Sequence, residues 1–366
     1  MLGRKESRWQ LLSTQSANYT QAAHHVAYID PCLSKKGFEM GQINAQNQLQ
    51  SSGRKAPLKP RRAPSKKMTW LKLLDLIKEG RGQGHLAQFD PWLQVTSKVS
   101  SPVSNIGRVP APDIERCHHY LAVAERRAIL LLKWIGAFDV REQFPIWPWD
   151  HRHPLEGLPS AGPLEKMPGL LTIAKECGIP HGVFFGTAVP YIATIDILST
   201  WAQPDGSFKL LATECKPAEL LVAGKDSKRR HERLQLTGHY CKLANIPRKI
   251  FHAERLPKEL PVNLDVLFPL MSRAAVEQTR QTDSYKWMLD AMCQHGYANR
   301  PHEIARVVAS KIGASFDEVI KLLHLALWTQ DIDHNLSLHL ELYRPFIRGG
   351  RELRERFKEE MWRETL

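Results

Sequence analysis

Residues 188–219 read AVPYIATIDILSTWAQPDGSFKLLATECKPAE, and this stretch decides the predicted fold. Two runs of apolar and β-branched residues flank a Pro-Asp-Gly turn signal, so we expect an antiparallel β-hairpin. The first strand carries one acid, Asp196, within an apolar run. The second strand ends in Glu214, Cys215 and Lys216. Side chains alternate along a strand, which places Glu214 and Lys216 on one face and Cys215 on the other.

The charged residues of this hairpin are typical of metal-dependent phosphodiester hydrolysis. Carboxylate oxygens such as those of Asp196 and Glu214 are ligands that Mg²⁺ prefers, with Mn²⁺ as a substitute. Bound ions polarise a scissile phosphate and generate hydroxide from water. Lys216 would orient or deprotonate that water, or neutralise charge in the transition state. An ordinary Glu–Lys pair on a strand explains the same residues without chemistry, and this alternative stays open.

A third acid lies upstream, in a helix predicted from His118 to Gly136. The apolar face of this helix at 100° per residue comprises Leu121, Ala124, Ala128, Ile129, Leu132 and Ile135. Glu125 falls within that face, where a carboxylate is costly unless it is paired or binds a cation. We therefore predict that Glu125 is a metal ligand or supports one. The alternative is a Glu at the edge of the face, paired with Arg126 or another base.

A basic helix is predicted directly after the hairpin, over residues 226–244, following a shorter helical segment at 217–222. Its first part carries Lys228, Arg229, Arg230 and Arg233. Arginine and lysine side chains make most contacts to the DNA backbone, so we predict that these four bind DNA phosphates. A basic run on a solvated helix face is the alternative.

The whole chain of 366 residues carries a formal net charge of +13, which favours a polyanionic partner such as nucleic acid. Its six cysteines form no CxxC pair, which argues against a zinc ribbon and against a disulfide framework. The N-terminus has no apolar signal segment, and no apolar run approaches membrane-spanning length. We therefore expect a cytoplasmic protein without a membrane partner.

Composition divides the chain into four predicted parts: a flexible basic arm at 1–67, an α/β domain at 68–260, a helical domain at 261–346 and a charged tail at 347–366. Besides those above, the α/β domain is predicted to contain helices at 68–79 and 171–177 and strands at 138–149 and 249–252. Pro145 and Pro148 place the strand at 138–149 at a sheet edge or end.

The helical domain contains three predicted helices, at 284–295, 301–312 and 315–328. Pro301 suits the first position of the second helix, and Ser315 with Glu318 forms a capping box at the third. Residues 329–337 alternate enough to be a β-wing. Three helices and a wing are typical of a small winged-helix domain. The tail beyond it is predicted as a charge-dense helix with few apolar anchors.

Taken together, these motifs resemble one family. The first motif is the helix with Glu125. The others follow it in chain order and are Arg141-Glu142-Gln143-Phe144-Pro145-Ile146, Thr194-Ile195-Asp196-Ile197-Leu198, Glu214-Cys215-Lys216-Pro217, Arg233-Leu234-Gln235-Leu236 with His239-Tyr240, and Leu322-Leu323-His324-Leu325 through Asp331-Ile332-Asp333. The order of these motifs over roughly residues 83–346 resembles the TnsA family, the endonuclease subunits of heteromeric transposases.

This resemblance implies a restriction-endonuclease-like PD-(D/E)xK fold, with a mixed central sheet flanked by helices and a winged-helix domain after it. It implies Mg²⁺-dependent cleavage of the 5′ ends of a transposon, while a partner transposase subunit acts on the 3′ ends. It also implies contact of the C-terminal region with an AAA+ ATPase regulator, in a bacterial protein associated with the nucleoid when active. Carried over by position, the catalytic set is Glu125, Asp196, Glu214 and Lys216.

The sequence departs from the family pattern at three places. Ile195 precedes Asp196, so the literal Pro-Asp pair is absent. Cys117-His118-His119 replaces the serine-containing start that the Glu helix often has. Glu214 is an acid where some relatives carry an amide, and an acid is closer to the general nuclease pattern.

Two other functions remain open at this point. One is a restriction or repair nuclease that acts alone, which would cut a fixed sequence without partner subunits. The other is a non-catalytic DNA-binding or assembly factor of a transposition complex, in which the acids have only a structural role. Metal binding that depends on Asp196 and Glu214 distinguishes a nuclease from such a factor.

Overall fold

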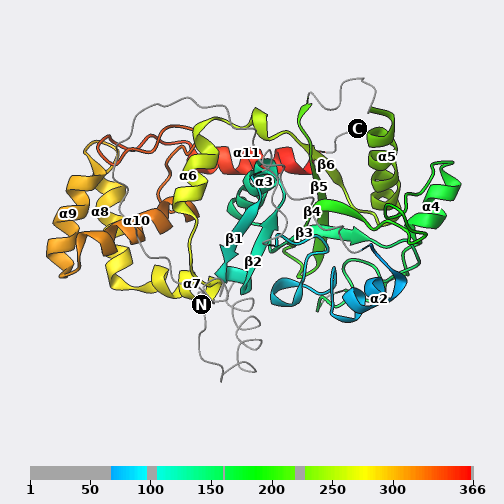
Figure 1. Cartoon of the computed structure of the whole chain (residues 1–366). Helices are drawn as coiled ribbons and strands as arrows, with labels where there is room; N and C mark the ends of the chain where they lie inside the picture. The colour runs from blue at the N-terminus through cyan, green and yellow to red at the C-terminus, as the bar shows by residue number, and fades with distance from the viewer. Residues whose placement is uncertain (1–66, 97–104, 160, 219–226, 364–366) are drawn as a thin grey trace, which may run out of the picture. The chain divides into compact units, whose positions relative to one another are not determined.

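The computed structural model describes residues 67–96, 105–159, 161–218 and 227–363, which belong to one compact unit of the chain (Figure 1). The predicted basic arm, apart from Lys67, and most of the predicted helical segment at 217–222 lie outside the described residues. The bounds of the strands are β1 Gly107–Ala111, β2 Arg116–Tyr120, β3 Asp139–Ile146, β4 Ala193–Ala202, β5 Phe208–Cys215 and β6 Arg248–Phe251.

The central sheet has four strands in the order β3-β4-β5-β6. Strands β3, β4 and β5 are antiparallel neighbours, whereas β6 runs parallel to β5. The sheet is therefore mixed, as predicted, and β3 lies at its edge. Strands β1 and β2 form a separate antiparallel pair.

The predicted hairpin at the centre of the sequence is confirmed as β4 and β5. Gln203 N donates to Ser207 O at 2.8 Å, and Gly206 adopts a left-handed φ of 83° that a side chain would disfavour. Asp205 Oδ1 accepts hydrogen bonds from the backbone and the hydroxyl of Ser207. The turn thus forms from the residue types that predicted it.

Helices cover both faces of the central sheet. The helices of this part of the chain are α2 Trp70–Lys78, α3 Val123–Trp134, α4 Leu170–Glu176 and α5 Ser227–Leu243, with short 3-10 helices η1 Leu86–Gln88, η2 Pro112–Ile114 and η4 Ala253–Arg255; α3 packs on one face of the sheet, and α4 and α5 pack on the other. One apolar cluster joins α3 to Ile197, Trp201 and Leu211 of the sheet. A second cluster joins α4 and α5 to Leu198 and Leu210 on the opposite face. Figure 1 shows the sheet between α3 and α5.

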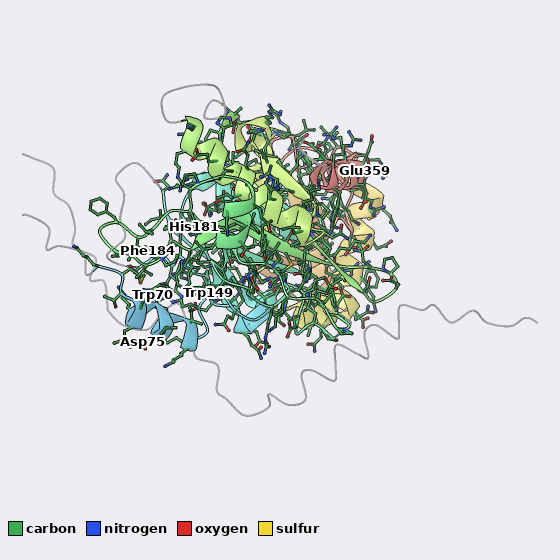
Figure 2. The ribbon with its side chains drawn as sticks, turned by 90° about the vertical axis from the view of Figure 1, so that its right-hand side faces the viewer. Trp70, Asp75, Trp149, His181, Phe184 and Glu359 are labelled. Carbon is green, nitrogen blue, oxygen red and sulfur yellow. The ribbon has the colours of Figure 1, made fainter. Side chains whose placement is uncertain are left out.

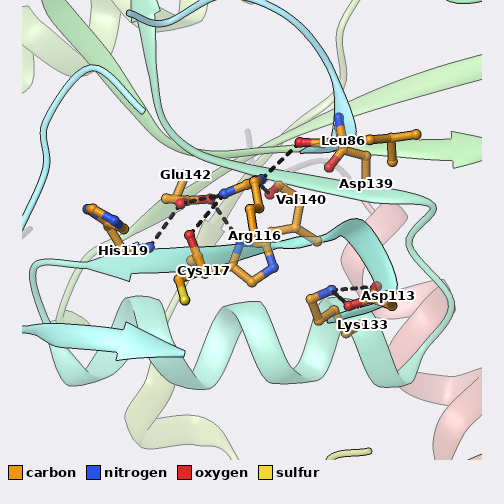
Figure 3. Close-up of polar contacts among 10 residues, drawn as sticks. Leu86, Asp113, Arg116, Cys117, His119, Lys133, Asp139, Val140 and Glu142 are labelled. Atoms are coloured by element: carbon orange, nitrogen blue, oxygen red, sulfur yellow. Dashed lines mark hydrogen bonds and ion pairs between the residues drawn. The ribbon is translucent and has the colours of Figure 1, made fainter. Parts of the chain in front are cut away.

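The start of α3 differs from the prediction, because residues 118–120 belong to β2 and the helix begins at Val123. The reason is a buried polar network that fixes β2 against β3 (Figure 3). Arg116 Nη1 lies 2.8 Å from Glu142 Oε1, and His118 Nδ1 lies 2.9 Å from Glu142 Oε2. The backbone N–H of His119 also donates to Glu142. The buried carboxylate of Glu142 therefore binds three residues of β2. This long-range contact stabilises a strand where the sequence pattern predicted a helix.

Beyond β6, the described residues fold mainly into α-helices. The α-helices are α6 Glu259–Leu267, α7 Arg273–Gln281, α8 Asp283–His295, α9 Pro301–Ile312, α10 Phe316–Thr329 and α11 Gly350–Trp362. The predicted start signals of two of them are confirmed. Pro301 is the first residue of α9, and Ser315 with Glu318 makes both hydrogen bonds of a capping box before α10.

The predicted β-wing at 329–337 is wrong, because this fully described segment contains no strand. Gln330 ends α10 with a left-handed φ of 62°. Ile332 and Leu336 are then completely buried in the helical core, and Asn335 Oδ1 accepts a hydrogen bond from Ser337 N, which closes a turn. The apolar residues of this segment alternate with polar ones because turns place the apolar side chains in the helical core. The alternation therefore does not reflect pairing with another strand.

The last helix, α11, is anchored more firmly than its charge-dense sequence predicted. Leu353, Phe357 and Met361 are buried in the same cluster as α3 and the helices α8 to α10. Trp362 makes an edge-to-face contact with Trp201 of β4, with ring centroids 5.5 Å apart. One apolar core therefore continues across the predicted domain boundary near residue 260, and the division into domains stays a prediction.

Within the described ranges, none of the helices combines the length and the apolar composition that crossing a bilayer requires.

Candidate active site

Asp196 and Gln143 lie at facing positions of β4 and β3, where the regular pairing of the two strands is interrupted. Gln143 has a left-handed φ of 50°, which is uncommon for a residue other than glycine. On β4, Ile195 packs into the α5-side cluster, while Ile197, two residues later, packs on the α3 side. Strict alternation would place both on one face. The backbone distortion at Gln143 and Asp196 therefore changes the face of the sheet to which the neighbouring side chains point.

Lys216 connects the two acids of the hairpin. Its Nζ lies 2.5 Å from Asp196 Oδ2 and 3.3 Å from Glu214 Oε2. The backbone N–H of Cys215 donates to the same oxygen of Asp196 at 2.8 Å. Burial alone would lower the pKa of Lys216, but the charges of Asp196 and Glu214 raise it above its usual value. Lys216 is therefore a cation at neutral pH.

Glu214 is almost completely buried, with 4% of its surface exposed. Burial and the neighbouring charge of Asp196 raise its pKa to about 7, although Lys216 acts in the opposite direction. Its Oε1 is buried and has no hydrogen-bond partner. An orphaned carboxylate oxygen is costly, and a cation would satisfy it.

Glu125 reaches this cluster from the first turn of α3. It is 7% exposed, and burial together with the charge of Asp196 raises its pKa to about 7. Its Oε2 accepts a hydrogen bond from Leu121 N at 2.7 Å, so Glu125 itself caps the helix that lacks a capping residue at Ala122. Arg126 pairs with Asp265 instead, which excludes the predicted alternative of a Glu125–Arg126 pair.

The donor set fits a divalent cation such as Mg²⁺. Three carboxylates, those of Glu125, Asp196 and Glu214, interact with one lysine, so acidic side chains outnumber basic ones. Oxygen ligands of this kind suit Mg²⁺. Across the described ranges, no group of three His, Cys, Asp or Glu side chains already has metal-binding spacing. Lys216 Nζ contacts both Asp196 and Glu214, so a bound ion would compete with the lysine for these carboxylates.

A comparison with curated proteins finds a relative in Escherichia coli, the transposon Tn7 transposition protein TnsA. The two sequences are 33% identical over 193 residues, which is 52% of this chain. The matched part of this chain is TnsA-like. The match spans 60% of the length of that curated relative. No protein-family model matches the chain.

The basic residues of this TnsA-like protein have different surroundings in α5. Lys228 and Arg233 are exposed, and the Arg233 guanidinium lies 5.8 Å from the centroid of the Tyr191 ring. Arg229 Nη1 donates to Pro180 O at 2.8 Å and pairs with Glu232 at 3.0 Å. Arg230 is half-buried. The start of α5 thus contacts the segment that leads into β4 and Asp196.

Gln143 is a residue of the candidate site that the sequence did not single out. It is 2% exposed, its Oε1 accepts from the Thr194 hydroxyl at 3.0 Å, and its side chain also hydrogen-bonds Glu125. It therefore links the edge strand to two elements of the site. The one signal in the sequence was a polar amide between Glu142 and Phe144 in a predicted strand. The left-handed backbone of Gln143 could not be predicted, because residues other than glycine rarely adopt it.

Proposed function

We propose that this TnsA-like protein is the Mg²⁺-dependent DNA endonuclease subunit of a heteromeric transposase and cuts the 5′ ends of the transposon. The observation that carries the proposal is the arrangement around Lys216, where Asp196 and Glu214 from adjacent strands contact one cation and Glu125 adds a third carboxylate. The sequence identity with a transposition protein supports the biological setting.

Each residue of the site has a distinct role in this proposal. Glu214 and Asp196 would hold Mg²⁺, and Glu125 would bind or support it from α3. When bound, the ion would polarise the phosphate and favour hydroxide formation from water. Lys216 carries a stable positive charge, so it donates hydrogen bonds to water or phosphate oxygens and offsets charge in the transition state. Gln143 holds the Glu125 carboxylate.

The DNA and protein partners are also part of the proposal. Lys228, Arg229, Arg230 and Arg233 would contact phosphates along α5, next to the segment that enters β4. A partner transposase subunit would act on the other strand, and an AAA+ ATPase regulator would bind the C-terminal helices. We place this activity in the bacterial cytoplasm, at the nucleoid.

The experiment is cleavage of a plasmid carrying transposon ends, with Mg²⁺ and the partner transposase subunit present. We expect Asp196→Asn and Lys216→Ala to abolish cutting at the 5′ ends. Asp205→Asn is the matched control, because Asp205 lies in the turn of the same hairpin and its carboxylate accepts hydrogen bonds from Ser207. Undiminished cutting by Asp196→Asn would reject the site.

The same assay separates the other two functions. Robust cutting at a fixed sequence by the isolated protein would indicate a nuclease that acts alone. End-specific assembly with no dependence of cutting on Asp196, Glu214 or Lys216 would indicate a non-catalytic assembly factor.

A further inference from the structure

Residues 183–190 form a compact hairpin loop just before β4. Val183 and Pro190 form an antiparallel bridge at its base, and Phe184 N donates to Val189 O at 2.9 Å. At its tip, the backbone N–H and the hydroxyl of Thr187 both donate to Phe184 O, at 3.0 and 2.8 Å. These hydrogen bonds define the conformation of the loop.

The two adjacent phenylalanines of this loop have opposite surroundings. Phe184 packs against Tyr191, with ring centroids 5.4 Å apart, and against the buried cluster that contains Val189 and Ile192. Phe185 is 98% exposed. Figure 2 shows Phe184 at the same side of the view as Trp70 and His181. The fold therefore anchors one ring and presents the next one, and the exposed ring contributes nothing to the apolar core.

Basic side chains line the loop. Lys67 and Arg229 lie next to two glycines at the loop. A Cβ atom on Gly186 would lie 3.4 Å from Lys67 Nζ, and a Cβ atom on Gly182 would lie 3.2 Å from Arg229 Nη2. Arg233 lies over the ring of Tyr191, which supports Phe184. The sequence from 177 to 195 contains no aspartate or glutamate. The basic side chains of Lys67 and Arg233 near the loop favour a polyanion, while Arg229 is already paired with Glu232.

The loop is also close to the candidate active site along the chain. Asp196 follows Pro190 by six residues, and a strand rises ~3.3 Å per residue, so the two are separated by at most about 20 Å. That length corresponds to roughly six base pairs of duplex DNA at ~3.4 Å per pair. The base of the loop therefore lies within about six base-pair lengths of a phosphate bound at Asp196.

We propose that Phe185 inserts between base pairs of duplex DNA beside the cleavage site and unstacks them. This inference rests on the proposed nuclease function and adds a DNA-deforming group to it. Phenylalanine wedges between base steps are a known means of kinking DNA, at a cost repaid by wider protein contact. Lys67, Arg229 and Arg233 hold the flanking phosphates while the ring enters the stack.

A protein partner fits the loop less well. Stable protein interfaces bury on the order of 800 Å² per partner around an apolar centre. Here one exposed ring projects from a narrow loop, and the basic side chains of Lys67, Arg229 and Arg233 lie near that loop. A single planar ring with flanking cations is suited to a base stack inside a phosphate backbone, because base–aromatic stacking tolerates any sequence.

The test uses the full chain and a duplex that carries 2-aminopurine at successive positions, read by fluorescence, together with anisotropy for affinity. We expect the wild type and Phe185→Trp to raise 2-aminopurine fluorescence at one step and to bind a mismatched duplex more tightly than a matched one, because a mismatch is already partly unstacked. Phe185→Ala should lose both effects and bind about tenfold more weakly. Its salt dependence should not change, since no charge is removed.

Tyr343→Ala is the matched control, because Tyr343 is an aromatic residue that is 67% exposed on a different segment. It should behave as the wild type. Equal fluorescence signals and equal mismatch preference in Phe185→Ala and the wild type would overturn the wedge, and if cleavage persists the proposed nuclease function stands. If Phe185→Ala instead binds DNA normally but associates more weakly with the partner transposase subunit, the loop binds protein and the wedge is rejected. Failure of the wild type to raise 2-aminopurine fluorescence at any step, while it still cuts transposon ends with the partner subunit present, would reject the wedge and leave the nuclease function standing.

Discussion

Lys216 Nζ lies 2.5 Å from Asp196 Oδ2 and 3.3 Å from Glu214 Oε2, so one ammonium group holds together two carboxylates that would otherwise repel each other. The lysine therefore occupies the electrostatic position that a metal ion would compete for. This relationship makes the stability of the site dependent on either Lys216 or a bound cation.

The first prediction concerns Lys216→Ala. In metal-free buffer we expect this variant to lose about 2 kcal/mol of unfolding free energy, because removal of one partner leaves buried charges unpaired. Added Mg²⁺ should raise its melting temperature by more than that of the wild type, since no lysine competes for the acids. Differential scanning calorimetry with and without Mg²⁺ measures both effects. An equal Mg²⁺ response in the two proteins would contradict this role of the lysine.

The second prediction concerns Gln143, which holds Glu125 and Thr194 from a left-handed position. We expect Gln143→Ala and Gln143→Gly each to lower kcat for cleavage by about tenfold, as expected when a hydrogen bond that positions a reacting group is lost. Gln143→Gly should be the more stable of the two by about 0.5–1 kcal/mol, because glycine accepts a φ of 50° without strain. Single-turnover kinetics and chemical denaturation measure these effects. Unchanged cleavage in both variants would remove Gln143 from the site.

The third prediction concerns pH and His118, which is completely buried beside Glu142. Burial lowers the pKa of His118 to about 4, although the charge of Glu142 acts in the opposite direction. The unfolded chain therefore binds this proton near pH 6.5, and the folded chain only near pH 4. Between these values the unfolded state holds more protons, so the contribution of His118 to stability is lost as the pH falls.

The measurement is the difference in unfolding free energy between the wild type and His118→Gln, followed from pH 7 to pH 4. We expect the wild type to lose on the order of 3 kcal/mol relative to the variant over this range. Taking the difference removes the contributions of acids that do not contact His118, which are the same in both proteins. A pH-independent difference would show that His118 does not change its protonation on unfolding.

The fourth prediction concerns the basic face of α5. If Lys228 and Arg233 contact phosphates, Lys228→Ala and Arg233→Ala should each reduce the slope of log affinity against log salt by about one. Lys258→Ala is the control, because the Lys258 side chain is 95% exposed and lies outside α5. If the slope does not change in the α5 variants, these basic side chains are exposed to solvent and do not contact DNA phosphates.

The sequence predicted the elements whose signals are local. The β4–β5 hairpin follows from its turn residues, α9 from Pro301 at its first position, and α10 from the capping box of Ser315. The grouping of Asp196 with Lys216 was also accessible, because pairing across the hairpin and alternation along β5 bring the two residues together.

The remaining features depend on contacts between distant residues. Strand β2 forms because Glu142 satisfies Arg116 and His118, which a helical pattern cannot reveal. The segment predicted as a wing is directed inward by burial of Ile332 and Leu336. The distortion at Gln143 has no local signal, since nothing in the sequence marks a left-handed glutamine. Strand β2, the segment at 329–337 and the distortion at Gln143 therefore depend on tertiary contacts that the local sequence does not reveal.

Binding of a divalent cation to the carboxylates around Lys216 tests the central claim most directly. Titration of the metal-free full chain with Mn²⁺, followed by calorimetry, should show binding that is lost in the double variant Asp196→Asn/Glu214→Gln. It should persist in Asp205→Asn, which alters an acid in the turn of the same hairpin. Equal Mn²⁺ affinity in the wild type and in the double variant would contradict the account.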